Sequence, residues 1–347
     1  MASENGNGPS GGGISRLWRR LRMNPALAWG CEISPAGVTL ARWNGSSSGA
    51  SAAAWRPLAA GAVEVSPLRE NLLRPEDVRQ ALAGCLESLG RSDALRPSPR
   101  MVDLALVIPD QAARVFFVSF DEFPRKPAQA IPLIRWKLKK SVPFDIDAST
   151  ISYQAIRQLT EWEVLVVVSP ETIIRQYELL AESLGLRPRF VTLSTLGSLG
   201  LVPAAEDASQ DSRVQPSQAS CLVAKYSPPW LTTTILYAGS VRLFRTVPIG
   251  AGGGAEAAPD SLQEILEAIH PSVAYFQDNF GQPLDRAYLC GLGDYGGRVA
   301  DSLSSELNLP TRPLLSEPAP AVAGWDAPQA ERHMAALLGI SRVRRRG

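Results

Sequence analysis

Side chains suited to catalysis are few in this sequence. His270 and His333 are the only imidazoles, and neither stands in a pattern with a serine or cysteine that would activate a nucleophile. Asp145 and Asp147 lie two residues apart after a proline, which is typical of a turn or helix start rather than of an acid–base pair. The four cysteines are far apart and form no C-x-x-C pair, which disfavours a disulfide framework and a zinc site. These residue types therefore predict no catalytic residues and no metal ligands.

A basic segment with an apolar face lies near the start of the chain. Over residues 14–23, apolar residues including Trp18 recur at three- and four-residue steps, and arginines including Arg19 and Arg20 fall on the other face. This pattern predicts a short basic amphipathic helix that contacts a membrane surface or a partner. A helix that packs on the protein body or frays is the alternative, because ten residues form a marginal helix alone.

A second basic group surrounds a helix predicted over residues 127–140. It suggests contact with an acidic partner or lipid headgroups, or more simply a solvated helix face. Trp136 within it is either a core residue or the wall of a peptide groove. The residues that we assign to partner or lipid contact here are Arg125, Lys126, Trp136, Lys137 and Lys140.

Composition and charge exclude several classes of protein. The chain has 347 residues, 45% of them hydrophobic and 20% charged, which suits about two globular domains and excludes wholesale disorder. Its net charge of +1 combines +3 over residues 1–23 and +4 over residues 341–347 with −6 elsewhere. Two basic ends on a mildly acidic body favour anionic lipid over nucleic acid as a partner. No segment resembles a signal peptide or a bilayer helix, so we expect a cytoplasmic protein.

The order of predicted elements indicates one α/β plan used twice, with a smaller unit inserted. The first set has three strands, a helix and a buried strand, at 26–32, 38–43, 54–65, 75–89 and 101–108. The second has the same order at 220–224, 231–238, 241–247, 261–280 and 287–290, with helices at 297–308 and 329–343. The smaller inserted unit lies between these two sets and has the predicted order β-α-β-β-α. A further helix is predicted from Val191.

Short segments along the chain carry a resemblance to a known family. They are Trp29–Val38, Asp121–Pro124, Lys139–Asp145, Ser152–Tyr153, Ala181–Pro188, Val241–Gly250 and Leu337–Arg342. In this order they resemble segments of the PilM family of type IV pilus assembly proteins, which are actin-like proteins related to FtsA. The resemblance covers roughly residues 26–343.

This resemblance implies an α/β, actin-like (ribonuclease H-like) two-lobed fold with an inserted small α+β domain. The implied divisions are a basic N-terminal tail at 1–25, lobe 1 at 26–110, the inserted domain at 111–188, a return to lobe 1 at 189–205, a linker at 206–219, lobe 2 at 220–328, and the C-terminal helix of lobe 1 with a basic tail at 329–347.

The resemblance also implies a function. Family members are cytoplasmic scaffolds at the inner membrane that bind ATP between the lobes and hold the N-terminal peptide of the membrane protein PilN. Contact with the assembly motor is a further implied property. The cytoplasmic part of the type II secretion protein GspL is a close relative of this family and remains an alternative.

The family's nucleotide site is altered in this chain. By resemblance, Glu32 and Ser34 lie in the first phosphate hairpin, Lys225 in the second, and Gly291 and Gly293 in the adenosine turn. Glu32 and Ser34 replace the family's Asp and Gly, and the proline that follows lacks an amide donor. The segment between residues 220 and 239 contains no Asp, Glu or Gly.

These departures predict a scaffold without ATP hydrolysis and without a required cofactor, although the resemblance leaves ATP with Mg²⁺ possible. Lys225 could contact a phosphate as a point charge, and a solvated surface lysine is the simpler interpretation. The alternatives are an ATPase with an atypical site and a sugar-kinase-like enzyme, and the missing acidic positions disfavour both.

Overall fold

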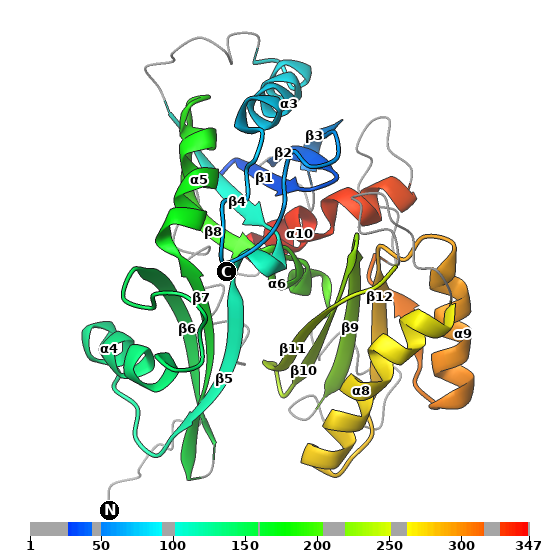
Figure 1. Ribbon diagram of the computed structural model, residues 1–347. Helices are drawn as coiled ribbons and strands as arrows, with labels where there is room; N and C mark the ends of the chain where they lie inside the picture. Colours follow the sequence, from blue (N-terminus) through cyan, green and yellow to red (C-terminus); the bar gives the residue numbers. More distant parts are fainter. Residues whose placement is uncertain are drawn as a thin grey trace, which may run out of the picture.

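A computed structural model describes residues 27–43, 50–91, 101–158, 160–203, 219–250, 262–315 and 327–345. The described part of the molecule contains two five-stranded sheets and one three-stranded sheet, with helices packed on them (Figure 1). The predicted N-terminal helix and most of the predicted linker lie outside the described residues. No helix within the described ranges is both long enough and apolar enough to cross a membrane.

Lobe 1 is built on the first five-stranded sheet. Its strands are β1 (Trp29–Ser34), β2 (Gly37–Trp43), β3 (Ala50–Pro57), β4 (Val102–Ile108) and β8 (Leu186–Leu193), in the order β3-β2-β1-β4-β8. The first three strands pair antiparallel, whereas β4 pairs parallel with both β1 and β8. The outer face is covered by α3 (Pro75–Ser88) and α5 (Glu171–Glu182).

Lobe 2 repeats this sheet. Its strands are β9 (Ser220–Ser227), β10 (Trp230–Tyr237), β11 (Ser240–Pro248), β12 (Arg286–Cys290) and β13 (Thr311–Pro313), in the order β11-β10-β9-β12-β13. The strand directions match those of lobe 1, and α8 (Leu262–Phe280) and α9 (Tyr295–Glu306) cover the outer face. Two sheets with three antiparallel strands followed by two parallel ones define the actin-like, ribonuclease H-like fold. The predicted fold class is confirmed.

The inserted unit consists of β5 (Arg114–Phe120), α4 (Pro127–Leu138), β6 (Ser149–Gln158) and β7 (Glu161–Pro170). Its strands form an antiparallel sheet in the order β5-β7-β6, and α4 packs on that sheet around a hydrophobic cluster of its own. At its start, η1 (Asp110–Ala112) connects β4 to β5.

Two sequence-based expectations near this unit are wrong. The range 111–188 extends too far, because the buried side chains of α5 belong to the core of lobe 1 and β8 pairs with β4 from Leu186 onward. The helix predicted from Val191 is instead the end of β8, which runs to Leu193 before α6 (Ser194–Ser198) and η2 (Leu199–Leu201) begin. Pairing with the buried strand β4 determines the conformation here, which local sequence preference does not capture.

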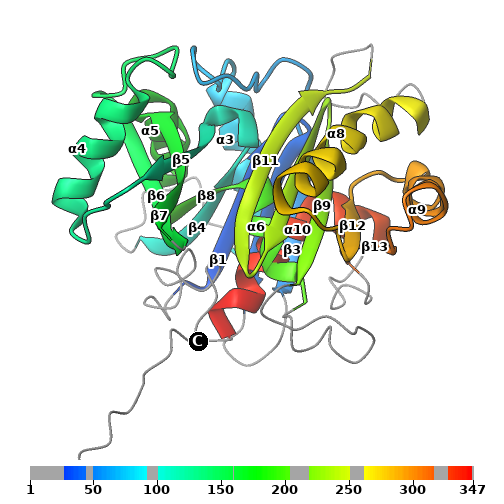
Figure 2. The same cartoon turned by 90° about the horizontal axis from the view of Figure 1, so that it is seen from below.

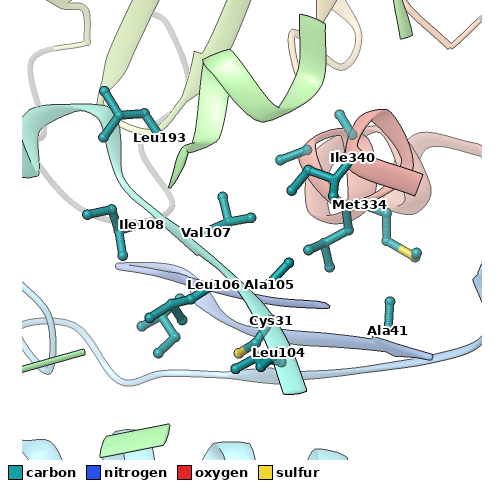
Figure 3. Close-up of a cluster of buried hydrophobic side chains, with 14 of the residues drawn as sticks. Cys31, Ala41, Leu104, Ala105, Leu106, Val107, Ile108, Leu193, Met334 and Ile340 are labelled. Atoms are coloured by element: carbon teal, nitrogen blue, oxygen red, sulfur yellow. The ribbon is translucent and has the colours of Figure 1, made fainter. Parts of the chain in front are cut away.

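The C-terminal helix α10 (Ala327–Arg345) lies between the two sheets (Figure 2). Figure 3 shows Met334 and Ile340 of α10 on the same side of the lobe 1 sheet as Val107. α10 crosses α6 at backbone contact: a Cβ atom at Gly339 would lie 2.2 Å from the carbonyl oxygen of Gly197. The order of layers is therefore outer helices, sheet, α6 with α10, sheet, outer helices.

We predict that Gly339→Ala destabilises the protein by about 3 kcal/mol, because the added methyl group has to separate two helices that touch through their backbones. The matched control is Gly297→Ala in α9, where a Cβ atom meets nothing within 4 Å. The control should stabilise the protein by roughly 0.5–1 kcal/mol through helix propensity. Urea unfolding of both variants measures the difference, and a Gly339→Ala variant as stable as the parent would contradict the packing.

Candidate functional site

The predicted nucleotide-site residues meet where strands of both lobes end. Glu32 lies near the end of β1 in lobe 1, and Lys225 lies near the end of β9 in lobe 2. Gly291 follows β12, in which Cys290 pairs with Lys225. The sequence-based grouping of these residues therefore corresponds to one region between the lobes. Gly293 lies in the same turn as Gly291, and Ser34 closes the hairpin turn after Glu32.

Lys225 is buried, which corrects the interpretation of a solvated surface lysine. Only 3% of its surface is exposed. Alternate residues of β9 face opposite sides of the sheet, and Val223 and Lys225 share the side that faces lobe 1. The strand thus points a charged side chain into the region between the two sheets.

The Lys225 ammonium is paired across the lobes. It donates a hydrogen bond to Ser194 Oγ, and Ser194 donates in turn to Glu32 Oε1. The direct Lys225 Nζ to Glu32 Oε1 distance is 3.8 Å. Ser194 is the first residue of α6, so this chain joins β9 of lobe 2 to α6 and β1 of lobe 1. Burying a charge is costly unless it is paired and hydrogen-bonded, and these three side chains provide both.

Asp110 forms a second polar link between the lobes. It lies two residues after the end of β4, at the start of η1, and is 5% exposed. The Thr195 backbone amide donates to Asp110 Oδ1 at 2.9 Å, and the Thr195 hydroxyl donates to Oδ2 at 2.5 Å. From β10 of lobe 2, the Thr232 hydroxyl also donates to Oδ2, at 2.9 Å. Three donors satisfy this buried carboxylate, and one of them comes from the other lobe.

A third link joins lobe 2 to the inserted unit. Arg242 of β11 donates to the Glu163 carboxylate of β7. The Arg242 side chain is 5% exposed, so the ion pair is largely shielded from water. The inserted unit is therefore held to lobe 2 as well as to lobe 1.

Gly291 has a structural role that needs no ligand. Its φ of +78° is a left-handed conformation, and a Cβ atom would lie 2.4 Å from the Tyr226 carbonyl oxygen. Its amide donates to Glu331 Oε1 of α10 at 3.1 Å. Burial raises the pKa of Glu331 above its ordinary value. The turn that the sequence resemblance assigns to adenosine thus gives an amide donor to a side chain of the protein itself.

α10 also contacts lobe 1 through His333. The imidazole stacks on the Trp55 ring of β3 with 4.5 Å between centroids. Burial, together with the charge of Arg332, lowers the pKa of His333 to about 4. Glu331 and His333 therefore tie one helix to both lobes.

Three side chains at this site bear on whether it could hold a magnesium-bound triphosphate. Lys225 occupies the second-hairpin position that the sequence resemblance assigns to a carboxylate, and its ammonium would repel a divalent cation. Glu32, the nearest carboxylate, already accepts a hydrogen bond from Ser194. The Ser34 hydroxyl is engaged with Gly37 across its own turn. Among the described residues, no three His, Cys, Asp or Glu side chains are placed to hold a metal ion.

The residues predicted for partner or lipid contact lie elsewhere. Arg125, Lys126, Trp136, Lys137 and Lys140 are all exposed and lie on or beside α4, at the outer edge of the inserted unit (Figure 1). Trp136 is 74% exposed, so the interpretation of this residue as part of the core is wrong. The other three assigned residues, Trp18, Arg19 and Arg20, lie outside the described residues.

Sequence reasoning missed the buried carboxylate of Asp110 and the residues that hydrogen-bond to the buried charges, which are Ser194, Thr195 and Thr232. A signal was present for Asp110. Asp110 lies two residues beyond the carboxyl end of an apolar strand, and Glu32 lies near the carboxyl end of the neighbouring strand. The position of Ser194 could not be predicted, because the sequence does not show that β8 continues to Leu193 and that the helix begins at Ser194.

Comparisons with known proteins locate this fold among solved structures. No protein-family model matches the chain, and no curated protein does either. A chain of the PilM-PilN type IV pilus biogenesis complex is similar with a TM-score of 0.67 and 16% identity, over 91% of this chain and 98% of that one. The two share one fold.

More distant similarity is found to two other structures. The cytoplasmic domain of EpsL, an inner membrane component of the type II secretion system of Vibrio cholerae, has a TM-score of 0.44 and 10% identity, over 76% of this chain and 81% of that one. A protein of unknown function with an actin-like ATPase fold from Bacteroides thetaiotaomicron has a TM-score of 0.44 and 10% identity, over 84% and 92%.

We predict that Lys225→Met destabilises the protein by about 3 kcal/mol, because it leaves the Glu32 carboxylate without its cation in a buried place. Adding Glu32→Gln should restore part of that loss, so that the two substitutions are not additive in a double-mutant cycle. Arg79→Met, which breaks an exposed 2.7 Å ion pair with Glu76, serves as control and should cost less than about 1 kcal/mol. Additive costs in urea unfolding would show that Lys225 and Glu32 do not interact.

The His333 pKa predicts a loss of stability in acid. In the unfolded chain this imidazole binds a proton near its ordinary pKa of 6.5, whereas the folded protein resists protonation until about pH 4. The unfolded state therefore binds more protons in this window, and stability falls as the pH falls. His333→Gln should reduce the loss between pH 7 and pH 5 in urea unfolding. Equal losses in both proteins would show that the folded site accepts an imidazolium.

Proposed function

We propose that the protein is a non-hydrolysing, PilM-like scaffold of a type IV pilus or related secretion platform at the cytoplasmic face of the inner membrane. In this proposal it binds the N-terminal cytoplasmic peptide of a PilN-like membrane protein and provides a contact surface for the assembly motor. The fold shared with a chain of the PilM-PilN complex, over 98% of that chain, supports this role.

The observation that carries the non-hydrolysing part is the contact of Lys225 with Ser194 and Glu32. Triphosphate hydrolysis needs a metal ion held against the phosphates and a positioned water. Here a side-chain ammonium stands beside the one carboxylate of the first hairpin. A metal ion would have to displace a buried, hydrogen-bonded cation, and that exchange leaves Lys225 without a partner.

The links between the lobes support a scaffold whose shape does not depend on nucleotide. Lys225 with Glu32, Thr232 with Asp110, and Arg242 with Glu163 all bridge lobe 2 to the rest of the protein. Packing of α10 against both sheets adds to them. A partner-binding surface on such a body is formed before the partner arrives, which lowers the entropic cost of binding.

The test is isothermal titration of the full chain with a synthetic peptide of the PilN-like protein's cytoplasmic N-terminus, with and without ATP and Mg²⁺. We expect the peptide to bind with the same affinity in both conditions, with no heat from ATP and no phosphate release. Turnover of ATP, or peptide binding that requires ATP, would support the rival ATPase with an atypical site.

A Lys225→Asp variant sharpens this test, because it places a carboxylate at the family's position. If the ammonium is what excludes the metal ion, only this variant should gain a heat signal with ATP and Mg²⁺. A parent protein that binds no peptide would reject the partner assignment and leave the nucleotide result standing.

A further inference from the structure

Lysine is distributed unevenly in this protein. The chain has 30 arginines and five lysines, and four of the five lysines lie within residues 126–140. The fifth is Lys225, buried between the lobes. Apart from Lys225, every basic side chain of lysine or arginine outside residues 126–140 is therefore an arginine.

That segment presents its charges outward. α4 packs on the inserted sheet through Ala130, Ile134 and Leu138, and its opposite face is exposed. Trp136, on that exposed face, has 74% of its surface accessible, the largest value among the exposed large hydrophobic side chains of the described residues. α4 lies at the outer edge of the molecule in both views (Figures 1 and 2).

We call this area the α4 basic surface and define it by Arg125, Lys126, Trp136, Lys137 and Lys140. Lys137 Nζ lies 5.8 Å from the centroid of the Phe120 ring, which keeps its side chain beside the sheet. Lys139 is less available because its Nζ lies 3.9 Å from Asp147 Oδ2. Three exposed carboxylates border the surface in sequence, at Asp121, Glu122 and Asp145.

We propose that the α4 basic surface docks on an anionic phospholipid bilayer. An indole ring has an apolar body and a polar N–H, and it is favoured at the boundary between lipid tails and headgroups. Lysine ammonium groups on flexible stems reach phosphates at varied positions, whereas arginine suits fixed, two-point contacts. An exposed tryptophan beside lysines therefore fits a fluid anionic surface better than a single rigid site. This contact goes beyond the proposed function, since it requires neither a peptide partner nor nucleotide.

The experiment is flotation of the full chain with vesicles of phosphatidylcholine containing phosphatidylglycerol, compared with phosphatidylcholine alone. We expect binding only to the anionic vesicles, and loss of binding as salt is raised. Lys137→Gln with Lys140→Gln should lower partitioning roughly 30-fold, since each basic residue near an anionic bilayer contributes about 1 kcal/mol. Trp136→Ser should also weaken it.

Matched controls remove similar groups from other surfaces. Leu179→Ser replaces an exposed apolar side chain of α5, and Arg298→Gln removes an exposed charge from α9. Both should leave vesicle binding unchanged. All of the substituted side chains are exposed, so thermal unfolding should be alike for the variants and confirm that each is folded.

Amine acetylation read by mass spectrometry locates the contact directly. Lys126, Lys137, Lys139 and Lys140 should react in the free protein and be protected by anionic vesicles, whereas buried Lys225 should stay unreactive in both states. Unchanged labelling, or binding that is lost on deletion of residues 1–23 and kept in the double lysine variant, would overturn the proposal. Binding to acidic peptides with no binding to vesicles would also overturn it.

Discussion

A buried ammonium group has to be paired, and in this protein that requirement determines how the two lobes meet. Lys225 comes from a strand of lobe 2, and its partners Ser194 and Glu32 belong to lobe 1. Separating the lobes would remove both hydrogen-bonding partners from Lys225 and the cation from Glu32, and Ser194 would keep only its hydrogen bond to Glu32. The contacts of Asp110 with Thr232 and of Arg242 with Glu163 also hold lobe 2 against the rest of the protein. Side chains of the protein itself therefore occupy the region between the lobes around Lys225.

The layered architecture makes these contacts possible. Two sheets of equal strand order bring the ends of β1, β4 and β9 to one region, and α6 with α10 fills the space between the sheets. Close approach of α6 and α10 needs glycine at Gly339, where a Cβ atom would lie 2.2 Å from the Gly197 carbonyl oxygen, and this packing fixes α6, which begins at Ser194. The polar contacts therefore depend on packing within lobe 1 as much as on the side chains that form them.

Much of the fold could be predicted from the sequence, because the spacing of apolar residues and the turn residues indicate the helices and strands locally. The sequence shows the repeated order of strands and helices, and it shows the hairpin whose second strand begins near Val38. The surroundings of Lys225 could not be predicted, since the strand was expected to end at Ala224 and the lysine to lie beyond it; β9 in fact runs to Ser227. Residues 191–193 pair with β4, a contact far away in sequence. For Trp136, hydrophobicity alone suggested burial, and the sequence does not show which face of α4 packs inward.

The central claim is that the lobes are held in one arrangement without nucleotide, and an interlobe distance measured by pulsed electron spin resonance tests it most directly. Spin labels at Glu87→Cys in α3 and Asp301→Cys in α9 report across the lobes, and the four native cysteines are buried. The account predicts one narrow distance distribution that ATP with Mg²⁺ leaves unchanged and that Lys225→Met broadens. A broad distribution in the parent protein that narrows or shifts on adding ATP with Mg²⁺ would contradict it.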